Sequence, residues 1–332
     1  MAGICGFYHK DNVKAECLKA MSMTLQHRGP DGYKEEYVQT AAGSLGIAYN
    51  KLNIQDSIQE SVQPLWSEEQ RILLAYDGSI YNVDSLKKEL PGFSWRGKGI
   101  AEVLTAAYLK WGIDFLNHID GMFAMVIFDR QDNTLYLCRD HMGKKPLYYH
   151  YDVRQNIVFG SEIQAILTFP QIKKEVNINI LPSFLYHWYF QEPDTAFKDI
   201  YKIKKGHYIK IQNGALSEHA YWTIGQAYTE GQKKLVTDYD EAKYELNLLL
   251  KEAVRKRMEG TDKTGAFLSG GYDSSMVCAL MQENSIQKIR TYCMGFEDSA
   301  FDERGYAERV ANHLGTEHRN LCISDREMLD TL

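Results

Sequence analysis

The chain has 332 residues, which is long enough for two domains. Hydrophobic residues make up 44% and charged residues 25% of it, as in ordinary globular proteins, and no apolar run could cross a bilayer. The formal net charge of −6 argues against a surface dedicated to nucleic acid or to anionic membranes. We expect no secretory signal, because the N-terminus has neither a basic lead nor a long apolar segment. Six cysteines without paired spacing favour a reduced, cytoplasmic protein: Cys5, Cys17, Cys138, Cys278, Cys293 and Cys322.

Short strands separated by turns dominate the chain up to about residue 210. Apolar or β-branched runs at 122–129, 134–140 and 146–152 are interrupted by turn residues, which is typical of antiparallel, largely buried sheets. A helical pattern lies between strands and ends at Gly112. We therefore expect an α+β domain of layered antiparallel sheets over residues 1–222.

The pattern changes after about residue 225, and we place the domain boundary at 223–234. A long amphipathic helix is expected at 239–258, with acidic residues first and basic residues last, as the helix dipole prefers. Predicted strands at 264–268 and 289–294, and a third at 318–323, then alternate with helices. This alternation indicates an α/β domain with a doubly wound parallel sheet over residues 235–332.

A glycine- and serine-rich turn follows the first of these strands and opens a helix: Leu268, Ser269, Gly270, Gly271, Tyr272, Asp273, Ser274 and Ser275. Two glycines let a backbone approach a phosphate closely, and the first amides of the helix face the same anion. Asp273 is placed where a Mg²⁺ ion could bridge phosphates. The alternative is a serine-capped glycine turn, which is common at strand–helix junctions.

The string AFLSGGYDSS resembles the SGG-x-DSS loop of ATP pyrophosphatases, in the version found in asparagine synthetases. The downstream segment FDE-x-x-YAERVANHLGTEH is also similar to that family. The resemblance implies binding of ATP with Mg²⁺ by the loop, and a backbone contact to adenine at Met294. In that family an amino-terminal glutaminase domain with N-terminal-nucleophile-type layered sheets precedes the ATP-binding domain.

Scaffold motifs of that glutaminase domain recur here in the family's order. They are HRGPDG at 27–32, Gln63-Pro64, GMFA at 121–124, an RD…G-x-KPLYY pattern at 139–149, and SEI at 161–163. In the family the first residue after Met removal is a cysteine, whose thiol attacks glutamine while its own α-amine relays the proton. Here that position is Ala2, which has no nucleophile. Cys5 is not a substitute, because its nitrogen lies within a peptide bond, and we expect it in the core.

Other positions of the glutamine site also depart from the family's pattern. Its NGE-IYN segment reads Asp77-Gly78-Ser79-Ile80-Tyr81-Asn82, so an oxyanion-binding asparagine is replaced by Asp77 and an ammonium-binding glutamate by Ser79. The second ammonium-binding carboxylate has become Ile100. The arginine that grips the substrate carboxylate aligns with Lys51, a point charge in place of a bidentate fork. We therefore expect a retained fold without glutaminase activity.

The resemblance implies an ATP-dependent amide ligase that adenylates a small carboxylate and uses ammonia or a substrate amine as the nitrogen source. Later motifs of the family's ligase domain are not visible, so we expect that domain to be incomplete here and a second chain to be a possible partner. Two alternatives stay open. One is a non-catalytic or split-enzyme subunit that binds ATP or another chain. The other is an active glutamine-dependent asparagine synthase.

Overall fold

The computed structural model describes residues 2–40, 43–53, 63–97, 99–259, 264–297 and 302–330. The chain divides into two compact units, one up to Lys233 and one from Lys234 onward. The first unit combines antiparallel sheets with helices and the second combines a parallel sheet with helices, so the predicted fold classes are confirmed. No helix in the described ranges is both long and apolar enough to cross a membrane.

The first unit contains two six-stranded antiparallel sheets. Sheet A has the order β10 (Ile200–Lys202), β8 (Tyr148–Tyr151), β9 (Ile157–Gly160), β1 (Gly3–His9), β3 (Gly43–Lys51) and β2 (Gly32–Thr40). Sheet B has the order β12 (Ala215–Ala220), β11 (His207–Gln212), β7 (Thr134–Arg139), β6 (Gly121–Asp129), β5 (Ile72–Ile80) and β4 (Leu65–Trp66).

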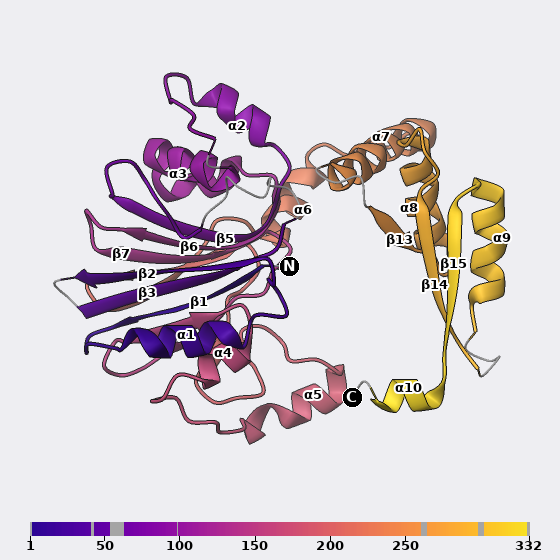
Figure 1. Ribbon diagram of the computed structural model, residues 1–332. Coiled ribbons are helices and arrows are strands. Elements are labelled where there is room, and N and C mark those ends of the chain that lie inside the picture. Colours follow the sequence, from indigo (N-terminus) through magenta and orange to yellow (C-terminus); the bar gives the residue numbers. More distant parts are fainter. Residues whose placement is uncertain are drawn as a thin grey trace. The chain divides into compact units, whose positions relative to one another are not determined.

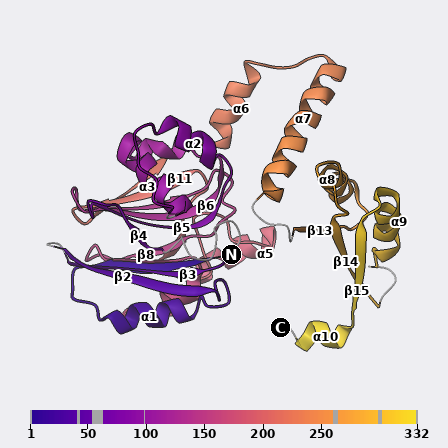
Figure 2. The same cartoon turned by 45° about the horizontal axis from the view of Figure 1, so that its top comes forward.

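The two sheets are layered between helices, as Figures 1 and 2 show. Helices α1 (Ala15–Met23) and α4 (Ile163–Leu167) cover the outer face of sheet A, whereas α2 (Val83–Glu89) and α3 (Ile100–Trp111) cover that of sheet B. Each of the three interfaces is a buried apolar core. The remaining helical segments of this unit are η1 (Gly112–His118), η2 (Ile178–Ile180), α5 (Leu181–His187) and α6 (Ile224–Gln232).

Strand alternation decides which side chains meet between the sheets. Successive side chains of a strand point to opposite faces. Ile4 of β1 therefore lies in the core between the sheets, with Leu73 and Ala75 of β5, whereas Cys5 lies in the core under α1. Asp77 continues the inward series of β5, so the site described below opens between the two sheets at the start of β1.

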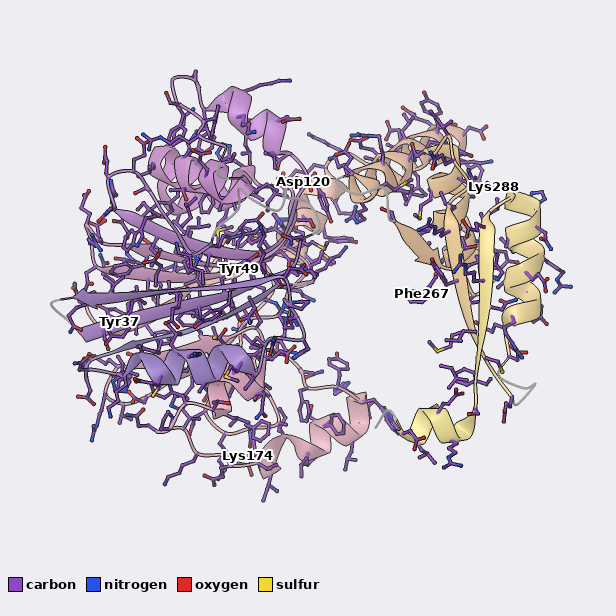
Figure 3. All side chains as sticks on the ribbon, viewed as in Figure 1. Tyr37, Tyr49, Asp120, Lys174, Phe267 and Lys288 are labelled. Carbon is purple, nitrogen blue, oxygen red and sulfur yellow. The ribbon has the colours of Figure 1, made fainter. Side chains whose placement is uncertain are left out.

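The second unit is a three-stranded parallel sheet in the order β13 (Gly265–Phe267), β14 (Arg290–Phe296) and β15 (Glu317–Ile323). Its helices are α7 (Tyr239–Met258), α8 (Tyr272–Glu283), α9 (Arg304–Leu314) and α10 (Asp325–Asp330). Leu268 and Cys293 pack against α8 and α9 in a small core. On the other face of this sheet, Phe267 is 79% exposed and stands away from those helices in Figure 3.

Candidate functional site

The position expected for a nucleophile lies at the beginning of β1. Ala2 is 6% exposed and packs in the core between the sheets. The main-chain nitrogen of Ala2 donates a hydrogen bond to Asp77 Oδ1 at 3.0 Å. Two residues later, Ile4 and Ser161 exchange two hydrogen bonds, which fix the start of β1 beside the segment after β9. The structure therefore brings Ala2 and Asp77 together, although 75 positions separate them.

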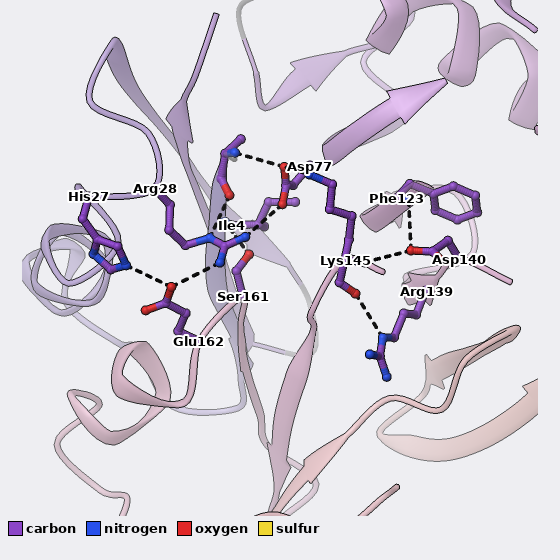
Figure 4. Close-up of polar contacts among 11 residues, drawn as sticks. Ile4, His27, Arg28, Asp77, Phe123, Arg139, Asp140, Lys145, Ser161 and Glu162 are labelled. Carbon is purple, nitrogen blue, oxygen red and sulfur yellow. Dashed lines mark hydrogen bonds and ion pairs between the residues drawn. The ribbon is translucent and has the colours of Figure 1, made fainter. Parts of the chain in front are cut away.

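Asp77 is the centre of a cluster of charges, which we call the Asp77 cluster: Arg28, Asp77 and Lys145, which are buried, and Glu162, which is partly exposed. The Asp77 carboxylate is 2% exposed. Its Oδ2 accepts a hydrogen bond from Arg28 Nη2 at 3.2 Å, and its Oδ1 lies 3.4 Å from Lys145 Nζ. Both oxygens of the carboxylate are thus occupied by groups of the protein itself (Figure 4).

Arg28 connects Asp77 to the main chain at Ala2 and to the partly exposed Glu162. Its Nε donates to the carbonyl oxygen of Ala2 at 3.0 Å, and its Nη1 donates to Glu162 Oε1 at 3.2 Å. The same Glu162 oxygen lies 2.9 Å from Nε2 of His27, whose side chain is 62% exposed. Figure 4 shows this line of contacts from His27 through Glu162 and Arg28 to Asp77. The chain of partners holds the carboxylate in one position.

Such a carboxylate cannot stabilise an oxyanion. An ionised carboxylate accepts hydrogen bonds and donates none, whereas the tetrahedral intermediate of amide hydrolysis needs donors. The Ala2 side chain carries no nucleophile, and both oxygens of the Asp77 carboxylate accept hydrogen bonds in this cluster. The structure instead shows a cluster in which the positive charges of Arg28 and Lys145 balance the carboxylates of Asp77 and Glu162. Through Asp77 on β5 and the main chain of Ala2 before β1, this cluster connects sheet B to sheet A.

Cys5 lies on the opposite face of β1 from Ala2 and Ile4. It is fully buried in the core under α1, and this burial, with a smaller effect of the Glu35 charge, raises the pKa of its thiol. Because the thiolate is the reactive form, Cys5 is a poor nucleophile. Its position agrees with a structural role.

We expect Cys5 and Cys138 to resist alkylation in the native protein. Both thiols are fully buried, and burial raises the pKa of each. Cys322 is exposed and serves as the internal control. Iodoacetamide labelling followed by peptide mass spectrometry should modify Cys322 first and the two buried thiols only after addition of denaturant. Labelling of Cys5 as fast as Cys322 would contradict this placement.

The other expected glutamine-site residues lie on three different elements. Gly78 follows Asp77 on β5, and an added Cβ there would lie 2.0 Å from the Met122 oxygen, so only glycine fits. Ser79 is half-buried on the same strand. Lys51 ends β3, and its carbonyl oxygen accepts a hydrogen bond from Asp31. Ile100 is the first residue of α3 and packs in the core between that helix and sheet B.

In the glycine–serine turn of the second unit, residues 268–275, the serine hydroxyl groups form hydrogen bonds within the turn. Ser269 Oγ and Ser274 Oγ are 2.9 Å apart, and the Gly271 nitrogen donates to Ser269 Oγ at 3.3 Å. The nitrogen of Leu268 donates to the carbonyl oxygen of Tyr292 at 2.8 Å, which places the turn beside β14. Both the turn and Met294 therefore lie toward the carboxyl ends of neighbouring parallel strands, where α/β sheets bind ligands.

The residues at this edge suit a phosphate group. Asp273 is exposed in the first turn of α8, whose leading amides have no partner within the helix. Gly271 leaves space beside the loop, since an added Cβ would touch only Ser269 Oγ at 3.4 Å. Ser275 Oγ is buried without a hydrogen-bond partner among the described residues. Met294 is 48% exposed.

We expect Gly270→Ala to lower the free energy of unfolding of this unit by about 1–3 kcal/mol. Gly270 has φ +83, and an added Cβ would lie 2.6 Å from Tyr306 Cβ on α9. Gly271→Ala is the matched control, because its Cβ would meet only Ser269 Oγ, at an ordinary contact distance of 3.4 Å, and should change stability by about 0.5 kcal/mol or less. Thermal unfolding of both variants checks this, and equal effects would disprove it.

Sequence reasoning missed the partners of Asp77. Arg28 lies in the HRGPDG segment, Lys145 in the KPLYY pattern, and Glu162 in SEI, all noted only as scaffold. The signal that could have found them is charge balance, because a buried carboxylate in place of an amide requires cationic neighbours. Arg28 and Lys145, which lie in two of these motifs, are the cations that compensate the charge of Asp77.

Two layered antiparallel sheets form the first unit, and a parallel sheet with a glycine–serine turn forms the second. Residues 1–222 match the family described as glutamine amidotransferase domain, and residues 245–332 match the family described as asparagine synthase. The chain belongs to the glutamine amidotransferase domain family through residues 1–222, and its residues 245–332 are similar to asparagine synthases.

Curated relatives agree over nearly the whole chain. A putative asparagine synthetase 2 of Methanocaldococcus jannaschii is 29% identical over 98% of this chain and 66% of its own length. Asparagine synthetases 1 and 3 of Bacillus subtilis are each 28% identical over 100% of this chain, and over 52% and 56% of their own lengths. The chain thus spans between half and two thirds of these relatives.

Solved structures support the fold alone. The glutamine phosphoribosylpyrophosphate amidotransferase of B. subtilis aligns with a TM-score of 0.51 at 12% identity, covering 99% of this chain and 92% of that one. A structure described as the allosteric regulatory enzyme of purine biosynthesis gives 0.52 at 12% identity, covering 99% and 91%.

Proposed function

We propose that this chain serves an ATP-dependent amide ligase related to asparagine synthetase, in which the amidotransferase domain no longer hydrolyses glutamine. A carboxylate is activated by transfer of AMP from ATP, with release of pyrophosphate. Ammonia or the amine of a substrate then attacks the activated carbonyl and displaces AMP. Aspartate is the acceptor that the names of the relatives suggest.

The observation that carries the proposal is the hydrogen bond from Ala2 to Asp77. At the position of the family's nucleophile there is a methyl side chain, and its main chain is held by a carboxylate that two buried cations compensate. The residues that would hold a glutamine ammonium are replaced by Ser79 and Ile100. Without a glutamine site, the nitrogen of the new amide would come from free ammonia or from the amine of a substrate.

ATP and Mg²⁺ have a suitable place on the second unit. We assign phosphate binding to the turn from Ser269 to Ser275, a backbone contact with adenine to Met294, and a metal contact to Asp273. The described residues contain no group of three or more His, Cys, Asp or Glu side chains that could hold a metal alone. Mg²⁺ keeps several waters and binds through one or two carboxylates plus phosphates, so Asp273 would supply one ligand and the phosphates of ATP others.

We expect the purified chain to bind ATP with Mg²⁺ and to release no glutamate from glutamine above background. Asp273→Ala should weaken ATP binding at least about tenfold when Mg²⁺ is present and much less in EDTA, because a single metal contact is lost. Calorimetry measures the first quantity and a coupled glutamate assay the second. Asp240→Ala, on exposed α7, is the control for charge loss.

Two results would contradict the proposal. Steady ammonia production or a covalent glutamyl adduct would show that the amidotransferase domain hydrolyses glutamine. The chain would then be an active glutamine-dependent asparagine synthase. Absence of any nucleotide binding by a folded protein would remove the ligase assignment.

A non-catalytic or split-enzyme subunit is the second candidate, and the open face of the parallel sheet favours it. Apolar side chains of this face are exposed to water: Phe267, Tyr292, Met294 and Leu321. A face of this kind normally packs against further protein, since parallel sheets are covered on both sides. Nucleotide binding without adenylation of any carboxylate, until a second polypeptide is added, would favour this candidate over a ligase acting alone.

A further inference from the structure

A cavity of about 340 Å³ lies in the first unit, on the outer face of sheet A. One side of it comes from α1 and the turn that follows, and the other from the start of β2 and the end of β3. Ala2 and Ile4 pack on the other face of sheet A, between the two sheets, and no member of the Asp77 cluster lines the cavity. The cavity, which we call the α1–β2 pocket, is therefore separate from that cluster.

The pairing of the strands places the side chains of this pocket on one face of the sheet. Asn50 of β3 lies directly opposite Tyr33 of β2, so their side chains share a face. Ser22 of α1 donates its hydroxyl hydrogen to Asn50 Oδ1 at 2.5 Å, so this is the face that α1 covers. Helix α1 and its C-terminal turn contribute residues that are three, four and seven positions apart, as on one side of a helix: Lys19, Ser22, Met23 and Gln26.

The buried amide of Asn50 offers hydrogen-bond donors to the pocket. Asn50 is 4% exposed, and its Oδ1 is occupied by Ser22. Its Nδ2 makes no hydrogen bond within the described part of the chain and is not sealed off from solvent, so it is open to the pocket that Asn50 lines. A side-chain amide nitrogen carries two N–H donors and no acceptor. A ligand that reaches this nitrogen must bring an acceptor.

The charge of the lining favours an anion. Lys19 is exposed, and its ammonium forms no ion pair with any residue in the described ranges. No carboxylate is among the described residues that line the pocket. Glu35 of β2 lies on the same face of the sheet, but it accepts the hydroxyl hydrogen of Tyr33 and does not line the pocket. The last carbonyl oxygens of α1 accept backbone amides of the turn that follows, so the helix end adds no unpaired acceptors.

Apolar surface around these donors comes from Met23, Pro30 and the ring of Tyr33. Met23 is 66% exposed and Tyr33 is 46% exposed, so both retain surface that a ligand could cover. A concave volume of about 300–1,000 Å³ with apolar walls and few polar groups is the usual form of a small-molecule site. The α1–β2 pocket is at the lower end of this range, which suits a ligand of few atoms.

We propose that the α1–β2 pocket binds a small carboxylate with an aromatic or branched apolar body. The carboxylate accepts hydrogen bonds from Asn50 Nδ2 and pairs with the ammonium of Lys19, while the apolar body lies against Met23 and Tyr33. Apolar burial supplies most of the affinity, and the two donor groups select the anion. The inference does not depend on the ligase proposal, because none of these residues belongs to the Asp77 cluster or to the second unit.

The test compares three probes of similar shape on the intact chain: phenylacetate, the neutral phenylacetamide and the cationic 2-phenylethylamine. Ligand-observed NMR titration should give phenylacetate a dissociation constant of roughly 1 mM, as expected for so few atoms. Phenylacetamide should bind about tenfold more weakly, and 2-phenylethylamine should not bind. No binding of phenylacetate at several millimolar, or binding of either other probe as tight as that of phenylacetate, would overturn the proposal.

Two charge variants then locate the site. Lys19→Gln should weaken phenylacetate about tenfold and leave phenylacetamide unchanged, whereas Lys14→Gln, an exposed change outside the pocket, should alter neither. Asn50→Asp keeps the shape and the acceptor of the Ser22 hydroxyl, but it places a carboxylate against the ligand and should abolish phenylacetate binding. If Asn50→Asp fails to fold, Lys19→Gln still decides. Unchanged phenylacetate binding by Lys19→Gln would place the site elsewhere and refute the assignment.

A third variant tests the apolar wall. Met23→Ala should weaken phenylacetate and phenylacetamide alike, by about threefold to tenfold, because both lose the same buried surface. Met142→Ala is the control, since Met142 is 55% exposed and lies outside the pocket. Equal effects of the two methionine variants would show that the apolar body of the ligand does not contact Met23, contrary to the proposal.

Discussion

Asp77→Asn is expected to lower the free energy of unfolding by about 3–5 kcal/mol, which is the usual effect of removing one partner from a buried ion pair. Lys145 is 6% exposed, and within the described residues its ammonium has Asp77 as its charged partner. Arg28 keeps Glu162 but loses its buried contact. The variant is nearly isosteric, so the loss reports charge compensation and not packing. Urea unfolding monitored by circular dichroism measures it.

Two comparison variants make this experiment decisive. Glu230→Gln breaks an exposed pair with Lys233 and should change stability by about 1 kcal/mol or less. Lys145→Met combined with Asp77→Asn removes the uncompensated ammonium and should recover a large part of the lost stability. If Asp77→Asn is as mild as Glu230→Gln, the Asp77 cluster is not what fastens the sheets.

Ala2→Cys alone is expected to leave glutamine hydrolysis at background. Restoring a thiol does not restore the oxyanion donor, and loss of one such donor lowers kcat by about 10²–10³ in enzymes that have the rest of the machinery. Here a carboxylate occupies that place and repels the developing charge. Glutamate release, measured on protein whose first residue has been verified by intact mass, checks this result.

The matched gain-of-function variant adds three substitutions to Ala2→Cys: Asp77→Asn, Ser79→Glu and Ile100→Asp. We expect glutamate release to become detectable only in this combination, provided that the protein still folds, which thermal unfolding reports. Activity in Ala2→Cys alone, at a level similar to the combination, would show that Asp77 does not obstruct the oxyanion. The role assigned to the Asp77 cluster would then be wrong.

Much of the fold was readable from sequence patterns. The helix predicted at 239–258 is α7 as observed, and the strands predicted at 122–129 and 134–140 are β6 and β7 within one residue. The strand predicted from 146 begins only at Tyr148, because Asp140 accepts the backbone nitrogens of Lys144 and Lys145 and holds the chain in a turn. The periodicity of the sequence indicates the strand, but it does not indicate the turn that the Asp140 side chain holds.

The site was less predictable than the fold. Single positions such as Ala2 and Asp77 could be read against a family pattern, since they depend on local spacing alone. The contacts of Asp77 with Arg28 and Lys145 join positions 49 and 68 residues apart, and only the stacking of one sheet on the other creates them. No local pattern encodes such a distance.

The Asp77 cluster makes four distant segments of the chain interdependent. Arg28 contacts Asp77, Glu162 and the main chain of Ala2, and Lys145 contacts Asp77 from a further segment. Substitutions within one network of this kind do not add. The effect of changing one member therefore depends on which side chains the other members carry.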